Sequence, residues 1–271
     1  MYAGVDIGGT KTLVAALNTE GVITEQERFP TPDNYEAFVE KLANTVANMS
    51  TKDFGAAGVG IPGKINREHG IGLDFGHLNW HHVPIQTDCE KIFHCPTVLE
   101  NDANLAGLSE AMLVPQYQKV LYVTVSTGIG TGVIDNRTIE PALADSEGGH
   151  ILLEHHGKLV TWESFASGHA LVEKYGKQAE ELGEHDAAWN HIARNLSRGI
   201  LELVAVIQPD VIIFGGSVGR YFERFQGPLH KYLKQYEMPL VTIPPLREAA
   251  RPEEAVIYGC YDLAKARYGS R

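Results

Sequence analysis

Short apolar runs alternate with amphipathic stretches along the first half of the chain. Apolar runs of strand length lie at Tyr2–Ile7, Ala56–Ile61 and Thr97–Glu100, whereas Tyr35–Ala47 and Ala103–Leu113 have the spacing of amphipathic helices. Strands and helices that alternate along a chain are typical of α/β folds. The pattern therefore predicts an α/β fold for this part of the protein.

The strand pattern starts again after a polar stretch, Pro115–Lys119, which opens with a residue that stops helices. We expect the chain to cross there from a smaller lobe at 1–115 to a larger lobe at 116–255. The length of 271 residues is sufficient for two lobes, at about 100–200 residues per domain. The end of the chain has helical spacing, and we expect a helix at 256–271 to pack back on the first lobe.

The second lobe also alternates strands with helices. The sequence predicts a strand at Leu121–Val125 and helices at Phe165–Tyr175 and His185–Ile207. A buried strand then follows at Asp210–Phe214 and ends at Gly215-Gly216, which we regard as a candidate ligand-binding turn.

Two further strands end in glycine turns of a kind that binds phosphate. These turns are Gly8-Gly9-Thr10 and Thr127-Gly128-Ile129-Gly130, and apolar residues after each predict a return strand. Backbone N–H groups can approach a phosphate closely only where no Cβ intervenes. Asp6 and Lys11, on either side of the first turn, would add a metal-binding oxygen and a positive charge. The alternative for the first turn is a structural hairpin whose glycines merely allow positive φ.

Composition narrows the possible partners. The chain has 44% hydrophobic residues, enough for a sizeable core, and its net charge of -11 argues against a nucleic-acid partner. The scattered cysteines Cys89, Cys95 and Cys260 form no C-x-x-C pair, which fits a reducing cytosol. No stretch approaches the roughly 20 apolar residues that span a bilayer, and no targeting segment opens the chain. We therefore expect a cytoplasmic protein that binds no membrane.

A cluster of polar side chains, Glu100-Asn101-Asp102, lies where a strand is expected to end and a helix to begin. Asn or Asp at such a position commonly caps the helix, and capping is the simpler interpretation of Asp102 alone. A carboxylate at a strand end can also act as a general base toward a substrate hydroxyl. Local sequence does not decide between these roles.

A glycine-rich segment offers groups that suit recognition of sugar hydroxyls. Glu147 and His150 flank two glycines, and Glu163 follows downstream; the alternative is that these are ordinary surface residues. The pairs His81-His82 and His155-His156 do not predict a metal site, because adjacent side chains point in different directions and no further ligand stands at helical spacing.

Several of these motifs occur in one order across most of the chain. They are Asp6–Lys11, Gly58–Gly63, Glu100–Asn104, Thr127–Gly130, Glu147–His150, Glu163-x3-Ser167-Gly168 and Asp210–Gly216. The set resembles the ROK family (repressors, open reading frames and kinases) of sugar kinases, within the superfamily of hexokinase, actin and heat-shock ATPases. The resemblance implies a two-lobed actin-like or hexokinase-like ATPase fold, with ribonuclease-H-like lobes and an active-site cleft between them.

The resemblance also implies a role for each matching residue. The residues implied to bind ATP are Asp6, Gly8, Gly9, Thr10, Lys11, Thr127, Gly128, Gly130, Gly215 and Gly216. Asp6 would hold Mg²⁺, directly or through water, and Asp102 matches the catalytic base. The positions implied to bind the sugar are Gly63, Asn101, Asp102, Glu147, His150 and Glu163.

Two segments depart from the family pattern. Many members hold a structural zinc with the equivalent of His150 and a C-x-C-G-x-x-G-C segment, but 152–163 contains no cysteine here. We therefore expect no zinc, and we expect packing by Trp162 and Phe165 to hold this loop. Some zinc-free relatives use polyphosphate, which is the alternative to ATP as donor. The second departure is His77-Leu-Asn-Trp80, where relatives often carry Asn-Leu before the Trp.

The resemblance implies an ATP-dependent kinase of the 6-hydroxyl of a hexose, with glucose as the first expectation, and it implies a homodimer. Kinases of fructose, mannose or N-acetylmannosamine are alternatives, because pocket shape sets the choice of sugar. A non-catalytic sugar-sensing regulator is a further alternative, although such relatives carry an N-terminal helix-turn-helix for which there is no room before Tyr2. An ATPase or structural relative of actin would lack the group formed by Glu147, His150 and Glu163.

Overall fold

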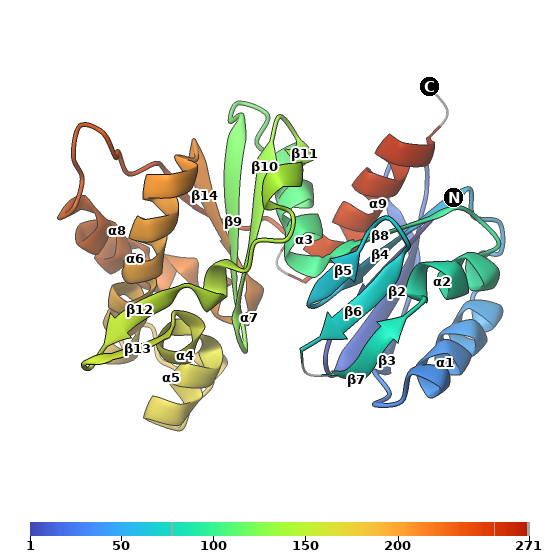
Figure 1. Cartoon of the computed structure of the whole chain (residues 1–271), viewed down its shortest axis with the longest axis horizontal. Helices are drawn as coiled ribbons and strands as arrows, with labels where there is room; N and C mark the ends of the chain where they lie inside the picture. Colours follow the sequence, from blue (N-terminus) through green and yellow to red (C-terminus); the bar gives the residue numbers. More distant parts are fainter. Residues whose placement is uncertain (77, 252, 270–271) are drawn as a thin grey trace. The chain divides into compact units, whose positions relative to one another are not determined.

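The computed structural model describes residues 1–76, 78–251 and 253–269, which form two compact units (Figure 1). The first unit comprises Met1–Ser109 and Glu254–Arg271, and the second comprises Glu110–Glu253. The stretch at which the sequence places the crossing, Pro115–Lys119, lies inside the second unit. The departure noted at His77 and the last two residues of the expected C-terminal helix lie outside the described residues.

The first unit is a mixed sheet with helices on both faces. Its strand order is β3-β2-β1-β4-β8, in which β1 pairs antiparallel with β2 and parallel with β4. The strands of this sheet are β1 (Tyr2–Ile7), β2 (Lys11–Leu17), β3 (Ile23–Pro30), β4 (Ala56–Ile61) and β8 (Thr97–Asn101). An antiparallel sheet beside it consists of β5 (Lys64–Asn66), β6 (Ile71–Phe75) and β7 (Leu78–Val83). The helices that begin in this unit are α1 (Tyr35–Asn48), α2 (Ile85–Phe93), α3 (Asp102–Met112) and α9 (Ala255–Tyr268).

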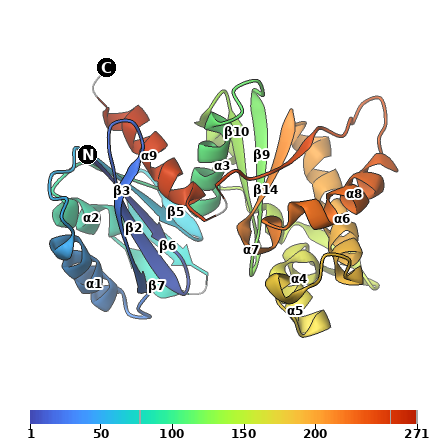
Figure 2. The same ribbon diagram turned by 180° about the vertical axis from the view of Figure 1, so that it is seen from behind.

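Successive residues of β1 face different helices, as the alternation of side chains along a strand requires. Val5 lies in a core with Phe38 of α1 and the apolar face of α2. Gly4 instead faces α9, where a Cβ would lie 3.2 Å from the backbone oxygen of Ile257. The two faces of this sheet are thus covered by α1 with α2 and by α9 (Figure 2).

The second unit repeats this plan. Its main sheet has the order β11-β10-β9-β14-β15, with β9 antiparallel to β10 and parallel to β14. The strands of the unit are β9 (Lys119–Val125), β10 (Ile129–Asp135), β11 (Thr138–Ile139), β14 (Val211–Gly215), β15 (Leu246–Glu248) and the hairpin strands β12 (Leu152–His155) and β13 (Lys158–Thr161). Its helices are α4 (Glu163–Ala166), α5 (Gly168–Tyr175), α6 (Ala187–Ile207), α7 (Gly216–Gly219) and α8 (Phe222–Lys234), with 3-10 turns η1 (Pro141–Leu143), η2 (Gly148–His150) and η3 (Ala179–Glu181).

The core of the second unit lies between its sheet and two helices. Leu121 and Val123 of β9 pack with Leu196 of α6 and Phe225 of α8, and all four are fully buried. Figure 1 shows α6 and α8 on the same side of β9 and β14. The expected α/β fold is therefore confirmed.

The helix expected at Phe165–Tyr175 is wrong in one respect, because α4 ends at Ala166 and α5 begins at Gly168. The interruption is at Ser167, which has an extended backbone and whose hydroxyl accepts a hydrogen bond from the Ala170 N–H at 3.3 Å. A serine in this position caps the second helix and so separates it from the first. Among the described residues, no helix is both long and apolar enough to cross a membrane.

Candidate active site

The first glycine turn joins β1 to β2 and is closed by a hydrogen bond from the Gly8 N–H to the Lys11 oxygen at 3.0 Å. Gly9, Thr10 and Lys11 are exposed. Neither glycine of the turn has positive φ. Positive φ therefore does not explain these glycines, and the missing side chain of Gly8 instead leaves room for the Lys11 oxygen, which a Cβ there would meet at 3.0 Å.

Asp6 at the end of β1 carries a carboxyl group whose burial raises its pKa to about 6, although the positive charges of Arg28 and Lys11 lower it. A carboxylate removed from water costs free energy unless a cation or hydrogen bonds stabilise it. Carboxylate oxygens are ligands that Mg²⁺ prefers. The chemistry of Asp6 therefore fits the role of a magnesium ligand.

Asn101 and Asp102 lie at the junction of β8 and α3. The cap of α3 is Asn101, whose Oδ1 accepts hydrogen bonds from the N–H groups of Ala103 at 2.9 Å and Asn104 at 3.3 Å. Its Nδ2 donates to the carbonyl of Gly63 at 3.3 Å. Asp102 is the first residue of α3, and its Oδ1 accepts the N–H of the neighbouring Ala103 at 2.7 Å.

Glu100 is a buried carboxylate beneath this junction, and Arg67 forms a two-pronged ion pair with it. Arg67 Nη2 lies 2.5 Å from Glu100 Oε1, and Arg67 Nε donates to Oε2 at 2.8 Å. Glu100 Oε1 also accepts the backbone N–H of Asn101 at 2.7 Å and the Asn104 side chain at 3.0 Å. The carboxylate thus fixes the backbone immediately before Asp102, and charge-assisted bonds of this kind are among the strong ones.

The second glycine turn joins β9 to β10 and is tied to α5. The Ser126 N–H donates to the Gly128 oxygen at 2.9 Å, and the Ser126 oxygen accepts the Gly168 N–H at 2.7 Å. The Thr127 oxygen accepts the His169 N–H at 3.2 Å. These hydrogen bonds therefore fix the turn to the first residues of α5.

Glu163 at the start of α4 links this turn to the candidate hydroxyl-binding groups. Its Oε2 accepts the backbone N–H of Ile129 at 3.2 Å, and its Oε1 lies 3.6 Å from His150 Nε2. His150 Nδ1 lies 3.8 Å from Glu147 Oε2. These last two distances exceed the usual length of a hydrogen bond. The polar atoms of His150 and Glu147, and Oε1 of Glu163, are therefore able to form hydrogen bonds with a ligand.

The side chains of Glu147 and His150 are 52% and 58% exposed, and that of Glu163 is 29% exposed. Desolvation raises the pKa of Glu147, and His150 opposes this rise.

The two glycines between Glu147 and His150 allow this segment to lie close to β10. A Cβ at Gly148 would lie 2.6 Å from the Thr131 side chain, and one at Gly149 would overlap the Ile129 carbonyl.

Trp162 is fully buried, and its indole N–H donates to the Asn195 oxygen of α6 at 3.1 Å. Phe165 is 8% exposed and stacks on His155 with ring centroids 4.3 Å apart. The loop that precedes Glu163 therefore packs through both aromatic residues that the sequence suggests. Among residues 1–76, 78–251 and 253–269, no group of three or more His, Cys, Asp or Glu side chains is arranged to hold a metal ion.

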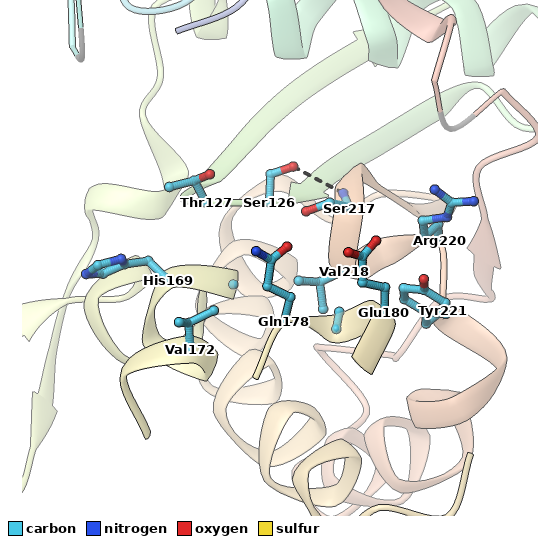
Figure 3. A pocket seen from close by; sticks show the side chains of 12 residues that line it. Ser126, Thr127, His169, Val172, Gln178, Glu180, Ser217, Val218, Arg220 and Tyr221 are labelled. Carbon is cyan, nitrogen blue, oxygen red and sulfur yellow. Dashed lines mark hydrogen bonds between the residues drawn. The ribbon is translucent and has the colours of Figure 1, made fainter. Parts of the chain in front are cut away.

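A cavity of about 260 Å³ opens between the second glycine turn, α5, η3 and α7 (Figure 3). Its lining includes Ser126, Thr127, His169, Gln178, Ser217 and Tyr221. The Ser217 N–H donates to Ser126 Oγ at 3.1 Å, and so joins the turn to the end of β14 (Figure 3). Gly215 and Gly216 allow this approach, because a Cβ at Gly216 (φ +86°) would lie 2.6 Å from the Val125 oxygen.

The predicted site residues fall into two groups, one on each unit. The first unit carries Asp6, Gly8, Gly9, Thr10, Lys11, Gly63, Asn101 and Asp102. The second unit carries Thr127, Gly128, Gly130, Glu147, His150, Glu163, Gly215 and Gly216. The structure adds Arg67 and the polar lining of the cavity, Gln178 and Ser217 in particular, which no local pattern in the sequence marks.

Comparison with known proteins gives the family. The sequence profile of the ROK family matches residues 2–267, and the chain therefore belongs to that family. A glucokinase of Streptomyces coelicolor is 28% identical over 276 residues, covering 86% of this chain and 87% of the relative. A fructokinase of Streptococcus mutans is 26% identical, covering 86% and 87%. The crystal structure of a ROK family glucokinase from Streptomyces griseus, in complex with glucose and AMPPNP, has a TM-score of 0.85 at 25% identity and covers 98% of this chain and 99% of that one.

Proposed function

We propose that this protein is an ATP-dependent sugar kinase that transfers a phosphoryl group to the 6-hydroxyl of a hexose, with glucose as the leading substrate. Family membership over residues 2–267 and the similarity to a glucokinase solved with glucose and AMPPNP support this class of reaction. The site residues and the sugar are parts of the proposal, which the following contacts support.

The observation that carries the proposal is the double contact of Glu163. One carboxylate oxygen accepts the Ile129 N–H of the second glycine turn, and the other lies beside His150. A turn suited to phosphate and a group suited to sugar hydroxyls therefore share one side chain. Phosphoryl transfer depends chiefly on positioning and on electrostatic stabilisation, and a shared residue meets the first of these needs.

Asp102 is assigned the role of general base. As the 6-hydroxyl oxygen attacks the γ-phosphorus, the bond from phosphorus to the β,γ-bridging oxygen breaks, and Asp102 takes the hydroxyl proton. Asn101 caps α3, and the pair of Arg67 with Glu100 holds the backbone at this point. Asn101, with the Gly63 carbonyl, is assigned to the sugar together with Glu147, His150 and Glu163.

The donor would be bound by the two glycine turns and the cavity. We assign Gly8 to Lys11 and Thr127 to Gly130 to the phosphates, and the cavity beside Ser217 to the nucleoside. Mg²⁺, when bound near Asp6, would neutralise charge on the phosphates. The similarity to a glucokinase solved with AMPPNP favours ATP over polyphosphate as the donor.

The free thiols Cys89, Cys95 and Cys260 are buried, which suits the reducing cytoplasm that we propose as the location. Assembly as a homodimer is also part of the proposal, and light scattering on the purified protein would test it.

The experiment that tests the function measures ADP release with MgATP and D-glucose, with Asp102→Asn assayed beside the wild type. Turnover that depends on glucose and is lost in the variant supports the kinase and its base together. A panel of fructose, mannose and N-acetylmannosamine, and polyphosphate as donor, separates the alternatives. No turnover with any of these pairs would refute the proposal.

A further inference from the structure

We propose that Arg198 of α6 is a positioning residue for the sugar, which holds Glu163 and His150 in place through the β12–β13 hairpin and needs a neutral His155 to do so. This inference rests on the proposed function and adds a regulatory property to it, namely sugar affinity that falls in acid.

The hairpin is the covalent link between the two sugar-binding side chains. β12 starts two residues after His150, and β13 ends two residues before Glu163. The Trp162 N–H donates to the Ile151 oxygen at 2.8 Å and closes the base of the hairpin. Leu152 and Leu159 are 60% and 70% exposed, so one face of the hairpin contributes little packing. Its orientation therefore depends on the other face, where Leu153 and Val160 pack against the core of the second unit and polar contacts add to them.

Arg198 supplies the charged contacts of that face. Its Nη2 donates to the Glu154 carbonyl, and its Nη1 lies 2.9 Å from Nδ1 of His155, near the tip of the hairpin. The guanidinium also lies 5.0 Å from the ring centroid of Phe165, whose other stacking partner is the His155 ring at an interplanar angle of 5°. Arg198 thus connects the hairpin tip to α4, two residues beyond Glu163.

The same face of α6 fixes residues on both sides of Glu163, namely Trp162 and Phe165. The backbone carbonyl of Asn195 accepts the Trp162 indole N–H at 3.1 Å. The side-chain Nδ2 of Asn195 donates to the backbone carbonyl of Phe165 at 2.5 Å. Gly199 leaves room for the Trp162 ring, which a Cβ there would overlap. Residues 195, 198 and 199 are neighbours on one face of a helix. Asn195 and Gly199 thus fix Trp162 and Phe165, and Arg198 fixes the β12–β13 hairpin.

The Arg198 contact with His155 requires one protonation state. Arginine only donates, so Nδ1 of His155 must accept, which it can do only in the neutral imidazole. The charged groups that face His155 are Arg198 and His191 of α6, Lys174 of α5, and His156 and Glu154 of the hairpin. Burial and the positive neighbours lower the pKa of His155, and Glu154 alone opposes them. The imidazole is therefore neutral at pH 7, and a proton added in acid turns the acceptor into a second donor.

The test measures the Kd of D-glucose by titration calorimetry without nucleotide, so that no turnover is needed. Arg198→Met keeps the length of the side chain and loses its donors. We expect the glucose Kd to rise about tenfold, the effect of one lost hydrogen bond to a charged group, while the KM for ATP, measured separately from the release of ADP, changes less than twofold. Arg194→Met, an exposed arginine one turn earlier in α6, is the matched control and should leave both constants unchanged.

A pH series from 7.5 to 5.5 separates positioning from simple loss of structure. His155→Asn keeps an acceptor near Nδ1 but does not titrate, so it should bind glucose like the wild type at pH 7.5 and more tightly than the wild type at pH 5.5. If Arg198→Met does not fold, His155→Ala replaces it and must raise the Kd at pH 7.5.

An Arg198→Met variant, or in its place His155→Ala, that binds glucose like the wild type would overturn the inference and leave the proposed function standing. Identical acid profiles for His155→Asn and the wild type would overturn the role of the neutral imidazole. A wild type that binds none of glucose, fructose, mannose and N-acetylmannosamine would overturn the proposed function, and this inference with it.

Discussion

The carboxylate of Glu163 accepts a hydrogen bond from the backbone N–H of Ile129 at 3.2 Å. The contact is possible because Gly128, the preceding residue of the turn, has no side chain. A Cβ at Gly128 would lie 2.6 Å from Glu163 Oε2. The turn and the carboxylate are therefore fitted to each other, and a methyl group between them should disturb both.

Gly128→Ala should displace the Glu163 side chain, because the added Cβ would overlap its carboxylate oxygen. We expect the KM for glucose to rise about tenfold, comparable with the loss of one charged hydrogen bond, with little change in melting temperature since only a side-chain end must move. Gly183→Ala is the control, because a Cβ there meets nothing within 4 Å. Equal KM values in the two variants would contradict this account of Gly128.

Glu163→Ala should weaken sugar binding more than Glu163→Gln does. Glutamine keeps an oxygen that can accept the Ile129 N–H, whereas alanine leaves the turn and the sugar hydroxyl without a partner. Calorimetric titration with glucose gives the affinities of both variants. Affinity of Glu163→Ala equal to that of the wild type would remove Glu163 from the sugar site.

Asp102→Asn should lower kcat by about 10²–10⁴, the range for loss of a general base. The asparagine oxygen can still accept the Ala103 N–H, so the start of α3 and the affinity for sugar should persist. A coupled assay of ADP release measures kcat, and circular dichroism checks the fold. A variant that turns over like the wild type would exclude Asp102 as the base.

Arg67→Met should lower the free energy of unfolding by about 3 kcal/mol, because it leaves the buried charge of Glu100 without its partner. Urea titration measures this change. Lys64→Met, at an exposed position of the preceding strand, is the control and should stay within about 0.5 kcal/mol of the wild type. If both variants unfold at the same urea concentration, the pair with Glu100 does not stabilise the first unit.

The free energy of unfolding should depend on pH in part through the protonation of His191. Burial, followed by the charge of Lys174, lowers its pKa below the ordinary 6.5, and its Nε2 lies 2.9 Å from Lys174 Nζ. The unfolded chain then binds this proton more readily than the folded one, so the free energy of unfolding falls as the pH drops below about 6.5. Urea titrations of the wild type and His191→Gln between pH 7.5 and 5.5 should show a smaller loss in the variant. A loss of the same size in both would contradict the prediction.

The sequence predicts those strands and helices whose own residues show a clear apolar spacing or end in a glycine turn. The strands before Gly8 and Thr127 and the helix observed at Tyr35–Asn48 follow from apolar spacing and glycine turns. Helix α8 was harder to predict because it contains Pro228, a residue that usually ends helices. The strands β5 to β7 are short and form a sheet only among themselves, so they too give a weak signal.

The residues of the candidate site also differ in whether the sequence predicts them. Asp102 and Glu163 stand in recognisable motifs, whereas Arg67 and Arg198 act on partners that are 33 and 43 residues distant in the sequence. No periodic pattern in the sequence predicts a contact between side chains that meet only in the folded chain. The role of Asn101 as the cap of α3 likewise became evident only from its hydrogen bonds, since Asp102 offers the same chemistry one residue later.

Helix α9 returns to the first unit after the whole second unit has been traversed. It packs so closely on β4 that a Cβ at Gly58 would lie 2.6 Å from the Cα of Cys260. On the ribosome, where domains generally fold as units while synthesis proceeds, the second unit is complete before this helix has been made. The unit that starts first therefore finishes last, and until then Leu13, Ala15 and Leu17 of β2 lack the apolar side chains of α9 that cover them in the finished fold.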